Sequence, residues 1–284
     1  EDPYLWLEDV LGVPALSWVR ACNAASRQEL ASTEDVRKLI ADMKTIMDSN
    51  ERIPFVGKQG PYCYNFWRDA QHPRGVWRRT TLAEYRKQDP KWENILDLDA
   101  LNQKENVNWV WSGAQILKAG GWRHVLISLS RGGADAIEVR EFDMKTKSFV
   151  KNGFHLPEAK GSMSWIDKDT VYVATDFGPD SMTTSGYPRI VKEWRRGTPL
   201  SAAKVVFEGK KTDMQVTAFY DDTKGYERHF VFCAPAFYKN DLYLRQKDGS
   251  LTRIDVPVDA NAGAHREWMM VTLRSAWEVE GKTY

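Results

Sequence analysis

Few side chains in this sequence stand at a spacing that supports catalysis. A hydrolytic serine needs a sharp strand-to-helix turn of the form Gly-x-Ser-x-Gly, which exposes its hydroxyl beside backbone donors. Ser130 and Ser185 lie near glycines but are not flanked in this way, so we interpret them as turn or strand residues. We therefore expect no catalytic residue in this chain, and no hydrolysis of peptides or esters by residues 1–284 alone.

Metal and cofactor chemistry has no clear motif either. The five histidines are scattered, and none belongs to His-Glu-x-x-His or another ligand spacing. Asp97-Leu98-Asp99 and Asp221-Asp222 lack the alternating oxygen ligands and the glycine of a calcium loop, so we interpret them as turn residues. No Gly-x-Gly-x-x-Gly loop is present. We expect no metal and no cofactor. The histidines interpreted as surface or strand residues are His124, His155 and His229.

Cysteine usage indicates neither a disulfide framework nor a redox site. Cys22, Cys63 and Cys233 are odd in number, far apart in sequence and form no Cys-x-x-Cys pair. The simplest interpretation is three buried free thiols. Such usage is compatible with the cytoplasm and does not exclude the periplasm.

Overall charge and hydropathy exclude several classes of partner. With 40 basic and 39 acidic side chains, the chain lacks the basic surface expected for nucleic acid or an anionic membrane. No apolar run reaches the roughly 18 residues that a membrane-spanning helix needs. No signal peptide is visible, but the sequence starts with Glu1 rather than Met. The localisation is therefore cytoplasmic or, if a signal peptide has been removed, periplasmic.

Residues 1 to about 50 predict a helical arm. Pro14 suits a first helical turn, and the cluster 32–35 (Ser-Thr-Glu-Asp) is a typical helix start. The helix that follows is strongly amphipathic, and a solvated stripe of this size is not expected in a monomer. We therefore expect a further domain, a separate chain or a second copy of this chain to cover it; the alternative is that the arm is poorly ordered. The stripe consists of Val36, Leu39, Ile40, Met43, Ile46 and Met47.

From about residue 53 onward, runs of β-branched and aromatic residues alternate with turn residues, as is typical of β-structure. Apolar anchors recur every 54 residues, and the first three each open a run of four strand-like segments. An earlier unit fits the same pattern, starting at 54–56. Four antiparallel strands per repeat of about 50 residues are typical of a β-propeller blade. The anchors are Trp111, Trp165, Phe219 and Leu273.

The predicted fold is therefore mainly β: an incomplete β-propeller of about four blades and part of a fifth, preceded by the helical arm. The predicted domains are 1–50 and 51–284, the latter truncated within a blade. A β-sandwich with coincidental spacing is the alternative, but it does not require one strand order at a constant period. An end inside a blade leaves an unpaired sheet edge, which predicts truncation and speaks against a closed four-bladed ring. Packing between blades then explains the tryptophans near the anchors better than stacking on carbohydrate or single strands.

Several segments resemble one known family. The opening 1–10 (EDPYLWLEDV) leads into Trp18-Val19 and Asn23 at the spacing found in the N-terminal arm of the prolyl oligopeptidase family of serine peptidases. Segments 128–143 and 187–200 are similar to that family's propeller. Each motif is modest, but their order and spacing together are specific.

The resemblance implies a seven-bladed propeller that caps an α/β-hydrolase domain and restricts its cavity to short peptides. It also implies that the arm packs on the hydrolase domain, which would supply the serine, aspartate and histidine. The chain would then be the N-terminal propeller portion of a serine peptidase that hydrolyses short peptides. Its partners would be the C-terminal hydrolase domain of the same protein and short peptide substrates. No substrate-binding residue maps onto this sequence. The alternative is a stand-alone propeller that acts as a binding module without activity.

Overall fold

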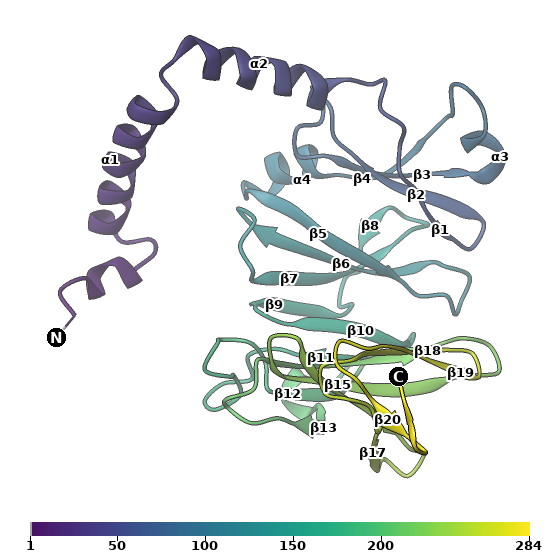
Figure 1. Cartoon of the computed structure of the whole chain (residues 1–284). Helices are drawn as coiled ribbons and strands as arrows, with labels where there is room; N and C mark the ends of the chain where they lie inside the picture. Colours follow the sequence, from purple (N-terminus) through teal and green to yellow (C-terminus); the bar gives the residue numbers. More distant parts are fainter. Residues whose placement is uncertain (1) are drawn as a thin grey trace. The chain divides into compact units, whose positions relative to one another are not determined.

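The computed structural model describes residues 2–284, which fall into two compact units (Figure 1). The first unit contains the chain up to Pro54 together with Arg68–Pro73. The second contains Phe55–Trp67 and Arg74–Tyr284. Helices dominate the first unit and four-stranded antiparallel sheets the second. Within the described residues, no helix is long and apolar enough to cross a bilayer.

The first unit confirms the predicted helices. Its elements are a short 3-10 helix η1 (Leu5–Glu8), α1 (Val13–Leu30) and α2 (Glu34–Asp48). Pro14 lies in the first turn of α1, where its missing N–H costs nothing. Thr33 caps α2, because its hydroxyl accepts a hydrogen bond from the Val36 backbone N–H at 3.4 Å.

The amphipathic stripe of α2 is open to solvent in this chain. Five of its six side chains are between 52% and 66% exposed, and Val36 is partly buried. Among the described residues of α1, only Ala15 is buried. These two helices therefore present apolar surface rather than a packed core.

One cysteine prediction is wrong. Cys63 and Cys233 are buried free thiols, but Cys22 is exposed. Cys22 belongs to α1, on which almost nothing packs. Burial, followed by the nearby Asp213 carboxylate, raises the pKa of Cys233 to about 12, so this thiol is inert at neutral pH.

The second unit contains four larger sheets, each built from consecutive strands, and two two-stranded hairpins. Sheet 1 contains β1 (Gly57–Gln59), β2 (Tyr62–Trp67), β3 (Val76–Thr81) and β4 (Glu93–Asp97). Sheet 2 contains β5 (Trp109–Ile116), β6 (His124–Arg131), β7 (Ile137–Asp143), β8 (Ser148–Phe149) and β9 (His155–Ala159). Sheet 3 contains β10 (Ser162–Asp167), β11 (Thr170–Ala174), β12 (Ile190–Arg195) and β13 (Lys204–Glu208). Sheet 4 contains β14 (Gln215–Asp221), β15 (Arg228–Ala236), β16 (Lys239–Arg245) and β17 (Leu251–Arg253).

Shorter elements connect or follow these sheets. The helices are α3 (Leu82–Tyr85), α4 (Leu98–Glu105) and the 3-10 helix η2 (Leu200–Ala202). Two hairpins follow sheet 4, namely β18 (Asn261–His265) with β19 (Trp268–Thr272), and β20 (Glu278–Val279) with β21 (Lys282–Thr283).

The four-strand repeat is confirmed, with two local differences. The first strand of sheet 1 is β1 rather than 54–56, because the two-residue turn Gly60-Pro61 pairs Gln59 with Tyr62 and so draws the residues just before it into the ladder. In sheet 2 the fourth position is divided. β8 pairs with Phe142–Asp143, whereas β9 pairs with the other end of β7.

The fourth anchor of the 54-residue period is wrong. Trp111, Trp165 and Phe219 lie in β5, β10 and β14, which are the first strands of their sheets. Leu273 instead follows the end of β19 and belongs to no strand. The chain after β17 forms two short hairpins. Because the connections between strands vary in length, counting 54 residues from Phe219 does not reach the first strand of a further sheet.

The sheets pack face to face because their central strands are apolar on both sides (Figure 1). In β11, Val171 and Val173 join the cluster shared with sheet 2, whereas Tyr172 and Ala174 join the cluster shared with sheet 4. Successive side chains of a strand point to opposite faces, so one strand serves two interfaces. This packing is that of propeller blades, and it fixes where the first strands of the sheets lie.

Candidate functional site

The first strands of sheets 2, 3 and 4 are tied together by hydrogen bonds. The Trp165 indole N–H in β10 donates to the Gln115 carbonyl oxygen in β5 at 2.9 Å. The Ser164 hydroxyl, also in β10, donates to the Ala218 carbonyl oxygen in β14 at 2.8 Å. These strands therefore lie beside one another and face a common space.

A cavity of about 910 Å³ occupies that space. Residues from β1, β5, β10 and β14 line it, so all four sheets contribute. The repeat anchors Trp111, Trp165 and Phe219 all belong to its wall. The anchor tryptophans that sequence analysis assigned to packing between blades therefore also border this cavity.

Stacked rings hold the aromatic wall in place. The ring of Trp111 lies 5.0 Å from that of Phe66 and 5.3 Å from that of Trp77, which itself stacks on Tyr64 at 5.4 Å. Such pairs add about 0.5–1.5 kcal/mol beyond the area they bury. The wall is thus a rigid part of the core between sheets 1 and 2.

Charged groups border the other side of the cavity. The Lys118 ammonium, just after β5, lies 3.5 Å from an Asp222 carboxylate oxygen just after β14. Asp167 and Glu227 also line the cavity, and neither has an ion-pair partner among residues 2–284. Backbone N–H groups, including that of Gly225, hold the pKa of Glu227 below its usual range. The cavity therefore combines three carboxylates with one ammonium.

The pKa of Tyr220 reflects the negative charge around the cavity. Its pKa is raised above the usual value, first by burial and then by the carboxylates around it. A phenol resists ionisation where negative charge is concentrated. The carboxylates in question are Glu227, Asp222, Asp221 and Asp167.

A second cavity, of about 590 Å³, adjoins the first and shares Asp167, Tyr220 and Glu227 with it. Its polar centre is His229, whose Nδ1 lies 2.8 Å from the Tyr172 hydroxyl. Burial, followed by the positive charge of Arg245, lowers the pKa of His229, so its neutral form is favoured. The pair forms a contact between sheets 3 and 4.

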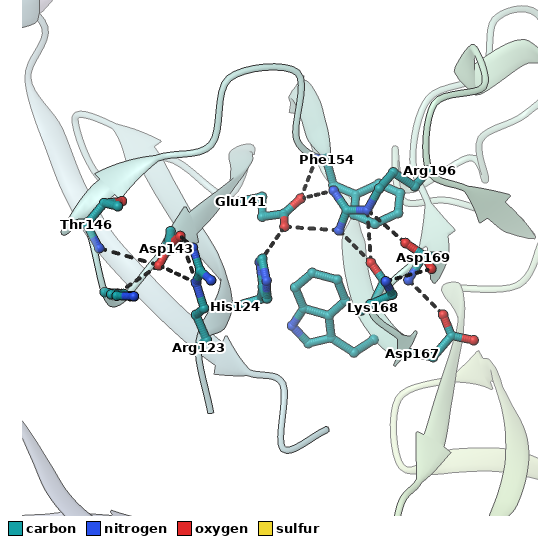
Figure 2. A network of polar contacts seen from close by, with 12 residues as sticks. Arg123, His124, Glu141, Asp143, Thr146, Phe154, Asp167, Lys168, Asp169 and Arg196 are labelled. Atoms are coloured by element: carbon teal, nitrogen blue, oxygen red, sulfur yellow. Dashed lines mark hydrogen bonds and ion pairs between the residues drawn. The ribbon is translucent and has the colours of Figure 1, made fainter. Parts of the chain in front are cut away.

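A buried carboxylate joins sheets 2 and 3, as Figure 2 shows. Glu141 in β7 is fully buried and accepts two hydrogen bonds from the Arg196 guanidinium, at 2.7 and 3.0 Å. It also contacts His124 Nδ1 at 2.9 Å and accepts the Phe154 backbone N–H at 2.9 Å. Every oxygen lone pair of this carboxylate is used in structure, which argues against a catalytic role.

The residues considered for chemistry are not brought together. His124, His155 and His229 lie in β6, β9 and β15, and the first two contact different glutamates, Glu141 and Glu138. Ser130 is a buried residue of β6 and Ser185 a turn residue. Among residues 2–284, no three His, Cys, Asp or Glu side chains are grouped to hold a metal ion.

The two aspartate motifs differ from simple turns. Asp97 caps α4 by accepting the Ala100 backbone N–H at 3.0 Å, and Asp99 accepts the backbone N–H groups of Arg74 and Gly75. Asp221 ends β14, whereas Asp222 reaches the cavity. Sequence reasoning missed Asp222 and Glu227 as cavity residues. The signal that could have found them is the acidic cluster just after an aromatic anchor.

The family model described as "Prolyl oligopeptidase, N-terminal beta-propeller domain" matches residues 1–233. The chain belongs to this family. It is 40% identical over 215 residues to an uncharacterized peptidase of Sinorhizobium fredii, covering 75% of this chain and 29% of that protein. It is 31% identical over 288 residues to an uncharacterized peptidase of Rickettsia prowazekii, covering 96% of this chain and 40% of that protein.

Solved structures agree with the family. A post-proline cleaving enzyme from Rickettsia typhi superposes with a TM-score of 0.89 at 31% identity, covering 98% of this chain and 42% of that one. Oligopeptidase B from Leishmania major shares the fold with a TM-score of 0.68 at 14% identity, covering 93% of this chain and 37% of that one. The chain thus spans well under half the length of these relatives.

Proposed function

We propose that residues 1–284 are the propeller portion of a prolyl oligopeptidase-like serine peptidase that hydrolyses short peptides. The observation that carries the proposal is the likeness to the Rickettsia typhi enzyme over 98% of this chain. In this division, residues 1–50 form the arm and residues 51–284 the propeller. The nucleophilic serine, its histidine base and its aspartate belong to a C-terminal α/β-hydrolase domain of the same protein.

The propeller's role in this proposal is to control access. The peptide would pass the cavity bordered by the first strands, and a narrow passage between rigid blades admits only short chains. The aromatic wall suits this role because stacked rings cannot move aside easily. Hydrolysis would proceed through an acyl-enzyme on the serine of the hydrolase domain.

The exposed stripe on α2 supports the presence of a covering domain. Fully burying one such side chain stabilises a protein by roughly 1.5–3 kcal/mol. A stripe with five side chains more than half exposed is therefore costly unless another surface covers it. The hydrolase domain is the covering surface we propose.

Peptide hydrolysis by two proteins tests the proposal. One is the 284-residue chain, and the other is the product of the longest reading frame that contains it. Internally quenched peptides of about ten and of about forty residues, each with one proline, serve as substrates. We expect the longer protein to cleave the short peptide, to lose activity with a serine-directed reagent, and to spare the long peptide. Activity in the 284-residue chain, or its absence from a longer folded protein, would contradict the proposal and favour a binding module.

A further inference from the structure

Four side chains form an unbroken row of hydrogen bonds across the boundary between sheets 3 and 4. The Arg245 guanidinium in β16 donates to a Glu193 carboxylate oxygen in β12 at 2.7 Å and to the Tyr172 hydroxyl in β11 at 3.1 Å. That hydroxyl lies 2.8 Å from Nδ1 of His229 in β15. Glu193 and Tyr172 belong to sheet 3, whereas the other two residues belong to sheet 4. Every contact in the row therefore joins the two sheets.

The two partners of the Tyr172 hydroxyl fix the direction of its hydrogen bond. Tyr172 is only 1% exposed, and burial raises its pKa, so the hydroxyl keeps its proton and must donate it within the protein. A guanidinium has no acceptor, so of the two groups against the phenol oxygen only the histidine Nδ1 can receive that proton. His229 is therefore a neutral acceptor at Nδ1 and carries its own proton on Nε2.

Protonation of His229 is incompatible with this arrangement. An imidazolium carries an N–H on both ring nitrogens, so Nδ1 can no longer accept and the buried Tyr172 hydroxyl loses its acceptor. A buried donor without a partner destabilises the contact between the sheets. The new charge also stands opposite Arg245, which is the cross-strand partner of His229 in the ladder of β15 and β16. Like charges at opposite positions repel each other.

The other groups around His229 do not offset these effects. Glu193 is the one carboxylate in the row, and Arg245 already pairs with it at 2.7 Å. Tyr220, opposite His229 on β14, contributes an uncharged ring at 4.6 Å. Burial, followed by the charge of Arg245, accordingly holds the pKa of His229 below its usual value. The remaining charged groups border the adjoining cavity of about 590 Å³ and are Asp167, Glu227, Arg228 and Lys247.

We propose that this row is an acid-sensitive joint between sheets 3 and 4, with His229 as its titrating group. While His229 is neutral, the row is intact and holds the two sheets together. In acid the hydrogen bond from Tyr172 is lost and the two sheets separate more readily. Tyr220 packs on this histidine and lines both cavities, so loosening of the joint alters their shared wall. Such control by pH goes beyond the proposed function and requires no hydrolysis.

Nuclear magnetic resonance tests the tautomer and the titration of His229 on the unmodified 284-residue chain. The imidazole signals are assigned through bonds and followed from pH 8 to pH 4.5. We expect His229 to carry its proton on Nε2 at pH 7 and to become an imidazolium only below pH 6.5, the usual pKa of histidine. A proton on Nδ1 at pH 7, or half-protonation at or above pH 6.5, would overturn the inference.

Hydrogen exchange tests whether the joint loosens. Because unfolded histidine binds a proton at a higher pH than folded His229, stability should fall as the pH drops from 6.5 through the lower pKa of the folded chain. After correction for the intrinsic effect of pH on exchange, we expect protection of β11 and β15 to drop about tenfold between pH 7 and pH 5, as for the loss of one buried hydrogen bond. Protection of β3 in sheet 1 should stay constant. Unchanged protection of β11 and β15, or an equal drop in β3, would contradict the joint.

Variants assign the effect to this row. His229→Asn places an amide oxygen near the position of Nδ1 and cannot be protonated, so it should abolish the pH dependence of exchange in β11 and β15. The matched control is His155→Asn in sheet 2, where the side chain is 58% exposed, and it should keep that dependence. If His229→Asn fails to fold, Tyr172→Phe removes the buried hydroxyl and should reduce the dependence to about a third. Full dependence in the folded variant, or its loss in His155→Asn, would contradict the assignment.

Discussion

At the scale of single residues, buried carboxylates hold the sheets together, whereas the exposed ones border the cavity. Glu141 is fully buried and uses both oxygens on partners from two sheets. Glu208 makes a comparable pair with Arg189 at 2.5 Å, but its side chain is 52% exposed. A solvated pair contributes little, while a buried pair leaves an uncompensated charge when one partner is removed.

Replacement of the buried carboxylate is therefore expected to destabilise the chain. Glu141→Gln should lower the free energy of unfolding by about 2–4 kcal/mol, somewhat less than a fully buried pair because Arg196 is partly exposed. The matched control Glu208→Gln should cost less than about 1 kcal/mol. Urea unfolding of the two variants measures both values. Equal losses of unfolding free energy in the two variants would contradict the structural role assigned to the buried Glu141–Arg196 pair.

The ionised Asp143 carboxylate is expected to stabilise the folded chain, and this stabilisation is expected to be lost in strong acid. The Arg123 guanidinium donates to it at 2.9 Å and lowers its pKa to about 2. A pKa below the unfolded value gives stability that is present above pH 3.8 and is lost as the pH falls through about 2. Asp143→Asn should thus be less stable than the unmodified chain at pH 6, with the difference shrinking between pH 4 and pH 2. Urea unfolding across that pH range measures it, and a constant difference would contradict the assignment.

At the scale of elements, alternation and helical spacing predicted most of the structure. The central strands β6, β11 and β15 were recognised because each is an apolar, strand-like run in a repeating order. The short strand β1 and the division of the edge beside β7 into β8 and β9 were not predicted. Turn geometry and pairing partners determine these features, and neither can be read from the sequence pattern. The cavity was missed as well. Lys118 and Asp222 are 104 residues apart, and only the packing of sheets brings them together.

The α2 stripe gives a prediction at this scale. Met43→Glu, at a side chain that is 52% exposed, should change the free energy of unfolding of the 284-residue chain by less than about 0.5 kcal/mol. In a longer protein with a covering domain, the same change should cost several times more, because it buries an unpaired charge. Lys38→Gln on the exposed polar face is the control for both proteins. A large loss in the 284-residue chain would mean that the stripe packs within this chain.

At the scale of the whole molecule, we propose that the propeller is a scaffold and filter and that a further domain carries the chemistry. We propose this division because the chain matches the N-terminal propeller domain of the family and spans less than half the length of its relatives. The cavity of about 910 Å³ is bordered by aromatic rings and carboxylates. A stand-alone binding module would share the cavity but would need no covering surface for α2.

Labelling with a fluorophosphonate probe tests this central claim most directly, because the probe reacts only with an activated serine. The 284-residue chain and the protein from the longer reading frame are treated in parallel and weighed by intact mass spectrometry. The account predicts one probe on each longer chain and none on residues 1–284. Stoichiometric labelling of the 284-residue chain, or no labelling of a folded longer protein, would contradict it.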